Sequence, residues 1–472
     1  MLEATEIHDA LAAVVGHEHV DLAVEPYLAD VTENPRGDAD VVVRPSSTGE
    51  VVEIARVAAR MGVAITPVVS GYNVAGIAIP RNGGIVVDFR RMDRIVEVDQ
   101  DAMVAVLEPG VTFGQLKAHL DADVPDLVYT YPFAPPFTSV VANALLDGLN
   151  NLSMRHGAMG KWITGAEVVL ADGTVARTGS GAVAPSWFGR APLPDLTGLF
   201  VSTQGTTGLV TKLGVQLVPR PHHRRRWFAF AYRLDVAYAA MRALARTGSF
   251  DDVGCMTWPA GKMLFGATRG LVHDADEPLA FLFVDVTGAS AAELAAREEL
   301  GRGLLDEMGV ESVFEVEHLL KLMPSMAKLA ELPTTLDFLL DFPGGGLAWV
   351  GSYGPGRGWT AGAAAGMAIL EEHGFPPFVV ARPMDGGHFY VLRFVACFDK
   401  GDAAEVDRVR VCMGQLADCV LDHGYVPYKA SADAAGRIVA RADPGFVTLM
   451  NRVRDALDPD RRLNPGRWPG LG

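Results

Sequence analysis

The segment Ile65–Pro80, Ile-Thr-Pro-Val-Val-Ser-Gly-Tyr-Asn-Val-Ala-Gly-Ile-Ala-Ile-Pro, decides how the rest of the chain is interpreted. The apolar run from 63 to 69 predicts a buried strand, which Ser70-Gly71 ends. Gly71, Ala75 and Gly76 keep side chains short, so successive backbone N–H groups can face one concavity that suits an anion such as pyrophosphate. Small residues after a strand also form ordinary turns, so this interpretation needs support from the surrounding sequence.

The surrounding sequence supplies a regular order of strands and helices. Strand signals cover 41–43, 63–69, 85–87, 95–98, 104–107, 166–170 and 209–217, and helical spacing covers 3–16 and 51–61. A Ser/Thr cap precedes the second helix, and Thr112 leads into a further helix near Phe113. The chain has no G-x-G-x-x-G segment that opens a helix, so the order predicts an α+β fold that is not of the Rossmann type.

This order resembles the FAD-binding fold of the vanillyl alcohol oxidase and p-cresol methylhydroxylase family. The resemblance continues through four more segments and covers about the first 220 and the last 50 residues: Ser139–Ala144, Gly165–Gly173, Gly205–Lys212 and Leu463–Gly466. It implies a two-lobed α+β protein with an FAD-binding domain at 1–220, completed by 425–472. Residues 221–424 are then an α+β cap domain for the substrate.

The cap domain is expected to begin after the basic run Arg220–Trp227, which we interpret as a solvated junction. Strands at 227–232, 279–286, 348–353 and 389–398 each precede a helical stretch, which predicts strands and helices on one sheet. The helices are expected at 235–246, from 289, at 361–373 and at 402–423. The Pro/Gly-rich stretch Asp341–Gly358 is predicted to be a mobile or substrate-lining loop.

Composition limits the partners. The 472 residues carry a formal net charge of −16, which argues against nucleic acid or an anionic membrane surface as the main partner. Four scattered cysteines lack metal-binding spacing and predict free thiols in a cytoplasmic protein, and the N-terminal sequence has no export signal. We expect a small-molecule substrate and an electron acceptor, either oxygen or a redox carrier, with a homodimer as one assembly the chain could form.

The resemblance implies FAD as the cofactor, with no metal. The residues expected to bind it lie in the Ile65–Pro80 segment and in the related segments downstream: Pro67, Ser70, Gly71, Tyr72, Asn73, Val74, Ala75, Gly76, Pro109, Ser139, Asn143, Gly205, Gly208, Val210 and Asn464. We expect non-covalent binding, because no His lies near Leu347 and no Cys lies in 147–162, where covalently linked relatives carry one. Tyr353 is the remaining candidate for a covalent link.

Four residues are candidates for catalysis. The resemblance places Tyr428 where phenol-oxidising relatives bind the substrate phenolate, whereas Lys429 replaces an arginine and keeps its charge without the planar fork. Alternation along 388–394 puts His388 and Tyr390 on one face of a strand and Arg393 on the other. His388 or Tyr390 could accept a proton, or His388 could be structural.

Two further family features are missing. The acid expected near the flavin would fall in 132–138, which contains no Asp or Glu, and Asp126 lies upstream of it. A second aromatic ligand of the phenolate has Tyr72 as its nearest equivalent. We therefore expect an FAD-dependent oxidoreductase that transfers hydride from a small organic substrate, a phenol or aromatic alcohol among the candidates, to the flavin. The alternatives are a D-2-hydroxy-acid dehydrogenase on the same scaffold and a flavin-binding protein without this chemistry.

Overall fold

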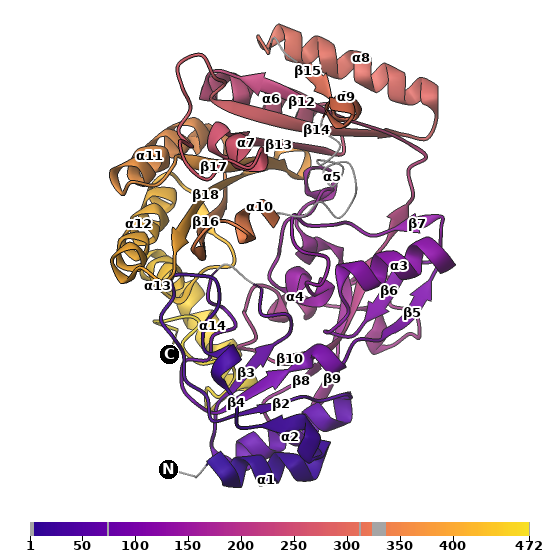
Figure 1. Ribbon diagram of the computed structural model, residues 1–472. Helices are drawn as coiled ribbons and strands as arrows, with labels where there is room; N and C mark the ends of the chain where they lie inside the picture. Colours follow the sequence, from indigo (N-terminus) through magenta and orange to yellow (C-terminus); the bar gives the residue numbers. More distant parts are fainter. Residues whose placement is uncertain (1–3, 73–74, 311–312, 323–336, 472) are drawn as a thin grey trace.

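The computed structural model describes residues 4–72, 75–310, 313–322 and 337–471. Figure 1 shows two lobes, which we call the first lobe (α1 to β11 together with α13 and α14) and the cap lobe (β12 to β19). The α+β architecture agrees with the expectation from the sequence. The boundaries at residues 220 and 424 stay a prediction.

The first lobe begins with a four-stranded sheet in the order β1-β2-β4-β3. Its strands β2, β4 and β3 are parallel, and the rest of the Ile65–Pro80 segment, which we expect to bind an anion, follows β3 directly. Ser47 caps helix α2, as its sequence predicts, by accepting a hydrogen bond from the Glu50 backbone N–H at 3.2 Å. The elements are α1 (Ala4–Val15), β1 (Val20–Asp21), β2 (Val41–Val43), α2 (Thr48–Met61), β3 (Ile65–Val68) and β4 (Ile85–Asp88).

An antiparallel five-stranded sheet, in the order β5-β6-β10-β8-β9, forms the second layer of the first lobe. Its buried side chains pack against α3 and α4, which brings α4 to the side that faces the cap lobe. The elements are β5 (Ile95–Asp99), β6 (Val104–Leu107), α3 (Phe113–Asp123), α4 (Val140–Leu145), α5 (Ser153–His156), β8 (Ile163–Val169), β9 (Val175–Arg177) and β10 (Leu209–Gln216). The short strands β7 (Leu127–Val128) and β11 (Val218–Pro219) pair with each other.

The cap lobe is built on one eight-stranded antiparallel sheet in the order β15-β12-β14-β13-β17-β18-β16-β19. Four long helices pack on one face and enclose the largest apolar core, while the opposite face turns toward the first lobe. The strands are β12 (His223–Ala231), β13 (Asp252–Thr257), β14 (Ala280–Gly288), β15 (Val313–Glu315), β16 (Gly345–Gly354), β17 (Phe378–Met384), β18 (Phe389–Asp399) and β19 (Val426–Pro427). The four helices are α6 (Leu234–Arg246), α8 (Ala291–Glu307), α11 (Trp359–Glu372) and α12 (Ala403–Asp422); α7 (Trp258–Leu264), α9 (Val316–Leu322) and α10 (Asp337–Leu340) are shorter.

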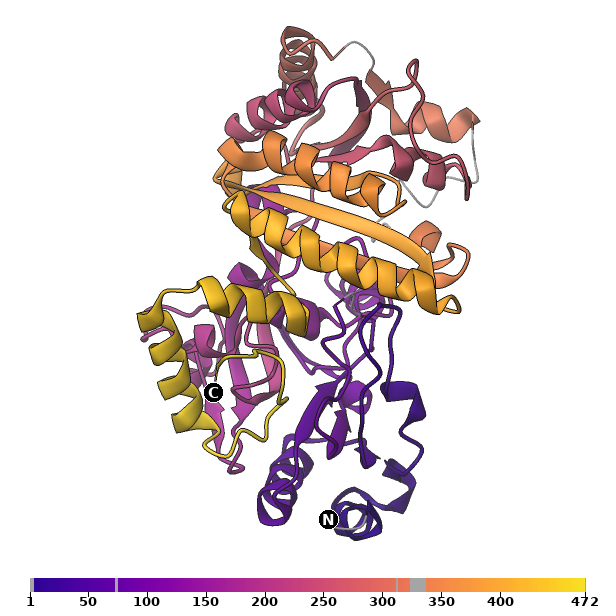
Figure 2. The ribbon, with the colours of Figure 1, turned by 90° about the vertical axis from the view of Figure 1, so that its left-hand side faces the viewer.

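The chain returns to the first lobe through α13 (Ala432–Arg441) and α14 (Pro444–Leu457), which Figure 2 shows beside the strands of that lobe. The segment after α14 then joins the edge of the first sheet. Leu463 forms a parallel bridge with Ile65, and the Asn464 backbone N–H donates to the Ile65 carbonyl at 2.7 Å. Two stretches nearly 400 residues apart therefore form one structural unit.

One prediction about the cap lobe holds only in part, and another was wrong. Residues 221–223 of the basic run are exposed between the two lobes, but β12 begins at His223, and Arg224 and Arg226 both pair with Asp285 on the neighbouring strand β14. The stretch Asp341–Gly358 is not a loop over most of its length, because β16 runs from Gly345 to Gly354 between β18 and β19. In both cases strand pairing across the sheet outweighs a local composition that is typical of loops.

Candidate functional site

A deep cavity lies between the two lobes, and both lobes contribute to its lining. The first lobe supplies the end of β3, the N-terminal part of α4 and the residues around the start of β10. The cap lobe supplies side chains of β16, β17 and β18 together with Tyr428 and Lys429. The two walls differ in character, so we describe them in turn.

The segment after β3 forms part of the first-lobe wall. Pro67, Ser70, Gly71 and Tyr72 line the cavity, and Gly71 has a left-handed φ of 72°. Within the described residues, a Cβ at Gly71 would meet no atom within 4 Å, so the space beside its backbone is open to a ligand. Asn73 and Val74 lie outside the described residues.

The end of this segment is held from behind. Ala75 is buried and Gly76 has a φ of 63°, but neither lines the cavity. The Gly76 carbonyl accepts a hydrogen bond at 2.6 Å from Nη1 of Arg467, which is almost completely buried. Burial lowers the pKa of Arg467 to about 10. Arg467 therefore places a buried cation behind this segment, and sequence reasoning missed it although it selected Asn464 three residues earlier.

Helix α4 supplies another part of this wall. Ser139 caps the helix by accepting from the Ala142 N–H at 3.0 Å, and its hydroxyl donates to the Pro109 carbonyl at 2.6 Å. Asn143 lies one turn further along, where its Nδ2 contacts the sulfur of Met159 at 2.9 Å. Pro109, Ser139 and Asn143 all line the cavity.

The loop before β10 meets the C-terminal segment at the same wall. Gly205, Gly208, Val210 and Asn464 line the cavity, together with Gln204, which sequence reasoning missed. A Cβ at Gly205 would lie 2.8 Å from the Pro67 ring, so only glycine permits this approach. Gln204 and Asn464 both have left-handed backbones, which cost energy and occur mostly where function requires them.

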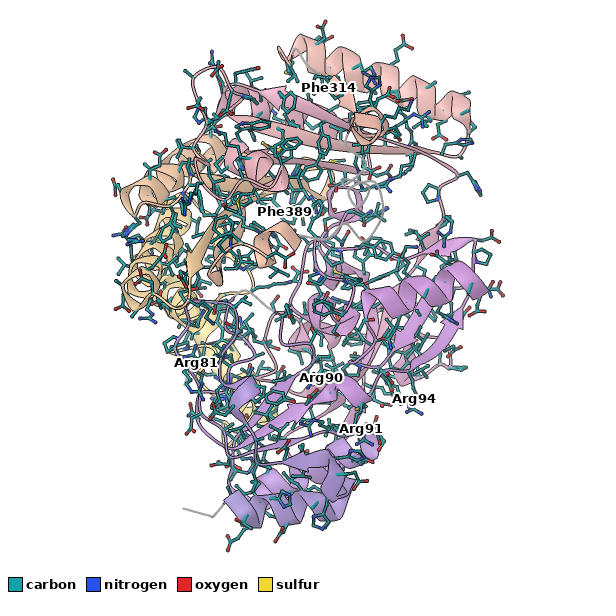
Figure 3. All side chains as sticks on the ribbon, in the orientation of Figure 1. Arg81, Arg90, Arg91, Arg94, Phe314 and Phe389 are labelled. Carbon is teal, nitrogen blue, oxygen red and sulfur yellow. The ribbon has the colours of Figure 1, made fainter. Side chains whose placement is uncertain are left out.

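These features fit a dinucleotide cofactor. Among the described residues, the buried side-chain oxygens Oε1 of Gln204 and Oδ1 of Asn464 have no hydrogen-bond partner, and both side chains line the cavity. They are acceptors for hydroxyl or amino groups of a ligand, whereas the backbone beside Ser70 and Gly71 suits its phosphates. Arg81 packs near the C-terminal segment, because its Cβ lies 3.3 Å from the position that a Cβ at Gly466 would occupy. Figure 3 labels Arg81 in the first lobe.

The cap-lobe wall carries long charged and aromatic side chains. Nη2 of Arg393 donates a hydrogen bond to the hydroxyl of Tyr428, and its guanidinium lies 3.9 Å from the centre of the Trp349 ring. Burial raises the pKa of Tyr428, although Arg393 counteracts this shift. Gly351 makes room for the pair, because a Cβ there would lie 2.8 Å from the Tyr428 ring. The wall thus presents a hydroxyl whose oxygen is held by a buried cation.

Lys429 lies at the junction of the two walls. Its Nζ donates to Oδ1 of Asn143 on α4, which links the residue to the first lobe. Burial, reinforced by the nearby charge of Arg393, lowers the pKa of Lys429 to about 7. Its φ of 48° is left-handed, which is uncommon for lysine. This ammonium group can therefore gain or lose its charge near neutral pH.

The ring of Tyr353 packs against the ring of Tyr428. The two rings are stacked with centroids 4.2 Å apart, and the Tyr353 hydroxyl donates to the Asp147 carbonyl at 2.8 Å. Tyr353 lies outside the cavity lining, whereas Leu347, at the place where some relatives carry a linking histidine, forms part of it. Tyr72 lines the cavity from the first lobe and packs edge-on against Phe137 at 4.7 Å.

His388 and Tyr390 are not brought to the cavity. Tyr390 packs against Tyr238 of α6 on the helix-covered face of the sheet, with ring centroids 5.3 Å apart, and His388 is exposed just before β18. Phe389, between them, is labelled in Figure 3 within the cap lobe. Tyr390 and Arg393 lie on opposite faces of β18, as the alternation predicts, but His388 precedes the strand, and the face with Arg393 is the one that lines the cavity.

Arg382 and Arg393 are the charged cavity residues that sequence reasoning did not select. Arg382 lies on β17, is 2% exposed and donates to the Asn150 carbonyl at 2.7 Å and to Asp252 at 2.9 Å. Its strand was not predicted, because Pro376, Pro377 and Pro383 interrupt or border the apolar pattern. The sequence signal that could have indicated them is an arginine within each of the apolar runs 378–384 and 389–398, since charged residues are uncommon in strands buried on both faces.

Comparison with known proteins agrees with this geometry. Residues 39–179 match the model of the FAD binding domain family. The 4-cresol dehydrogenase [hydroxylating] flavoprotein subunit of Pseudomonas putida is 25% identical over 92% of this chain and 88% of its own length. The glycolate oxidase subunit GlcD of Bacillus subtilis is 32% identical, but over only 49% of each chain. A crystal structure of p-cresol methylhydroxylase with substrate bound superposes with a TM-score of 0.88 at 20% identity, covering 98% of this chain and 96% of that one.

The fold and the cavity define a flavin-dependent oxidoreductase with FAD as its cofactor. The chain is similar to FAD-dependent oxidoreductases of the p-cresol methylhydroxylase type, as the resemblance implied. The described residues contain no helix long and apolar enough to cross a membrane, and no group of three or more His, Cys, Asp or Glu residues arranged to hold a metal ion.

Proposed function

We propose that this protein oxidises a small aromatic substrate whose ionised ring hydroxyl is bound by Tyr428. The observation that carries the proposal is the buried Arg393–Tyr428 pair, which shares one cavity with the cofactor-binding wall and with Lys429. A hydrogen bond to a charged group contributes about 1.5–3 kcal/mol, so such a pair discriminates strongly in favour of an anionic oxygen.

Apolar side chains on the cap-lobe wall would bind the ring of the substrate. Trp349, Val380 and Val395 line the cavity from the cap lobe, and Phe133 lines it from the first lobe. They exclude water and accept a flat apolar group, and the lower effective dielectric strengthens the interaction of Arg393 and Lys429 with an anion. The site therefore combines apolar walls with a localised positive charge, as a phenolate requires.

Arg393 and Lys429 would favour the ionised form of the substrate, in the absence of an acidic residue in the 132–138 segment. In the described part of the chain no carboxylate lines the cavity. The two cations lower the pKa of a bound phenol, so the substrate binds ionised without a dedicated base. The electron-rich ring then favours departure of hydride from the carbon attached to it.

The first-lobe wall would hold FAD through Ser70, Gly71, Gln204, Gly205 and Asn464. When bound, FAD supplies the acceptor for the hydride. We propose that its attachment is non-covalent, since Leu347 lies at the wall and the Tyr353 hydroxyl is engaged with Asp147. The electron acceptor, the homodimer and the cytoplasmic location stay predictions.

Acid precipitation tests the attachment of the cofactor. We expect all yellow colour to pass into the supernatant, with no flavin in the pellet. Flavin that stays with the precipitated chain would contradict non-covalent binding, and peptide mass mapping would then begin with the peptide that contains Tyr353.

Anaerobic reduction of the bound flavin tests the substrate class. The panel contains para-alkyl phenols, aromatic alcohols, the O-methyl ethers of the best phenols and aliphatic D-2-hydroxy acids. We expect bleaching by phenols and at least tenfold slower bleaching by their methyl ethers, which have the same shape but cannot ionise. Bleaching by D-2-hydroxy acids alone would support the rival dehydrogenase, and equal rates for phenols and ethers would remove the role of Tyr428.

A further inference from the structure

The cavity contains more positive charge than one phenolate requires. Among the described residues that line it, Arg382, Arg393 and Lys429 are cationic and none is acidic. Lys429 contacts the first lobe through Asn143, and Arg393 contacts Tyr428. Arg382 remains as a third cation, although the protein as a whole is strongly acidic.

Arg382 and Arg393 lie close together on adjacent strands. Strands β17 and β18 are antiparallel, with Val380 opposite Arg393 and Arg382 opposite Val391. The two arginines therefore occupy diagonal positions on the same face of the sheet, within reach of each other for long side chains. Burial lowers the pKa of Arg382, and the charge of Arg393 adds to this effect while Asp252 opposes it. Two buried guanidinium groups that repel each other need a shared anion.

Each arginine retains an unused donor. Nε of Arg382 and Nε of Arg393 are buried and have no hydrogen-bond partner among the described residues. Arg382 is 2% exposed and Arg393 is 6% exposed, so both are more than nine-tenths buried. A buried donor without an acceptor destabilises the folded protein, and a ligand that accepts a hydrogen bond from it removes that cost.

The nearby acid does not fully compensate for these charges. Asp252 accepts from Nη2 of Arg382 at 2.9 Å, but burial raises the pKa of Asp252 to about 7. Asp147, near Lys429, also has a raised pKa because it is buried. Near neutral pH, the surroundings of the arginine pair thus retain net positive charge.

We propose that the substrate carries a carboxylate in addition to its aromatic ring, and that Arg382 and Arg393 bind it together. The carboxylate has two oxygens in one plane, which matches the N–H groups of guanidinium ions. A phenolate offers a single oxygen, which the proposed function assigns to Tyr428. The inference rests on the proposed function only for the phenolic part of the substrate, and it names the class as phenolic aromatic acids.

A binding measurement tests the carboxylate without any oxidation. The holoenzyme is titrated with 4-hydroxybenzoate and with 4-hydroxybenzamide, which has the same shape and no charge, and the change in the flavin absorption spectrum gives each Kd. We expect the acid to bind at least tenfold more tightly than the amide. Equal affinities would overturn the proposal.

Two variants assign the effect to Arg382. The double variant Arg382→Gln/Asp252→Asn removes both members of the buried ion pair, because removing one alone leaves an uncompensated charge. We expect it to abolish the preference for the acid. Arg382→Lys keeps the ion pair but loses Nε, and we expect a several-fold weaker preference even where the double variant fails to fold. An unchanged preference in Arg382→Lys would contradict the proposal.

The matched control uses the neighbouring ion pair outside the cavity. Arg155 donates to Asp251 at 2.7 Å, directly before Asp252 in the chain. Arg155→Gln/Asp251→Asn should leave the preference for the acid unchanged, and a loss equal to that of the Arg382 variants would show a general electrostatic effect and overturn the assignment.

The two proposals can fail separately. Benzoate, which lacks the hydroxyl, should also bind more tightly than benzamide in an Arg382-dependent manner. That result without bleaching by any phenol would retain the carboxylate site and reject the phenol oxidation. Bleaching by para-alkyl phenols without any preference for acids over amides would retain the oxidation and reject the carboxylate site.

Discussion

The two walls of the cavity present different chemical groups to the ligands that we propose. The first-lobe wall uses backbone groups and small residues, such as Ser70, Gly71 and Gly205. The cap-lobe wall uses long side chains, namely Trp349, Arg382 and Arg393, that project from three strands of one sheet. Backbone geometry suits a cofactor that every turnover shares, whereas side chains can change with the substrate while the strands that carry them remain. Variants of the first wall should therefore alter FAD content, and variants of the second should alter substrate oxidation.

The largest expected effect concerns the first wall. Gly71→Asp should give folded but colourless protein, because a carboxylate in the open space beside the backbone repels the phosphates of FAD. The flavin absorbance per protein measures the effect. Gly62→Asp is the control, since Gly62 has a similar φ of 66° with no described atom within 4 Å of its Cβ position, and lies at the end of α2. Gly71→Asp protein with full FAD content would place the phosphates elsewhere.

On the second wall, Tyr428→Phe should leave FAD content unchanged and slow flavin reduction. The lost hydrogen bond to an ionised oxygen is worth about 1.5–3 kcal/mol, which corresponds to about one to two orders of magnitude in rate. Rapid-mixing absorbance measures it. Tyr425→Phe is the control, because the Tyr425 hydroxyl donates to the Pro355 carbonyl outside the cavity. Equal rates in wild type and Tyr428→Phe would show that Tyr428 is structural.

The third prediction concerns the effect of the hydrogen bond from Arg467 to the Gly76 carbonyl on the affinity for FAD. Arg467→Met removes the hydrogen bond to the Gly76 carbonyl, and we expect about tenfold weaker FAD binding with unchanged substrate preference. Equilibrium titration of the FAD-free protein gives the affinity. Arg454→Met is matched, since Arg454 is a buried C-terminal arginine that donates to the Leu471 carbonyl instead. An equal loss in both variants would indicate general damage to the C-terminal segment.

The smallest effect is a pH dependence at the junction of the walls. Because the pKa of Lys429 is lowered to about 7, the residue is charged below that pH and neutral above it. Binding of a strongly acidic phenol, ionised throughout the range, should therefore weaken several-fold as the pH rises through about 7. Lys429→Arg should remove this decline, since arginine keeps its charge. Titrations across pH measure both, and parallel curves would contradict the assignment.

The same division explains what the sequence could predict. The strand at 41–43, the segment after β3 and the pair Tyr428-Lys429 depend on local patterns and order along the chain. The structure contains the strand, and residues of the other two line the cavity, while their roles stay predictions. Arg393 was placed on the face opposite Tyr390 by alternation alone. Which face lines the cavity depends on the helices α6, α11 and α12, which cover the other face, and no local pattern reports it.

Other differences have the same origin. Arg382 acquires its position because β17 pairs with β13 and β18. Strand β13 is far from β17 in the sequence, and β18 follows β17 after a turn. A change of composition and a basic run with Pro predict a junction at 220–227, whereas Asp285 pairs with Arg224 and Arg226 only because β12 and β14 are aligned. Long-range strand pairing thus decides the features that single-sequence patterns miss.

The hydrogen bond between Arg467 and the Gly76 carbonyl also has a consequence for biosynthesis. It joins residues 391 positions apart, so a nascent chain whose first lobe has already emerged from the ribosome still lacks this anchor. Tight loading of FAD must wait until elongation has passed Arg467 and the cap lobe has been made. A chain truncated before Arg467 would therefore retain the whole FAD binding domain region at 39–179 but bind FAD more weakly.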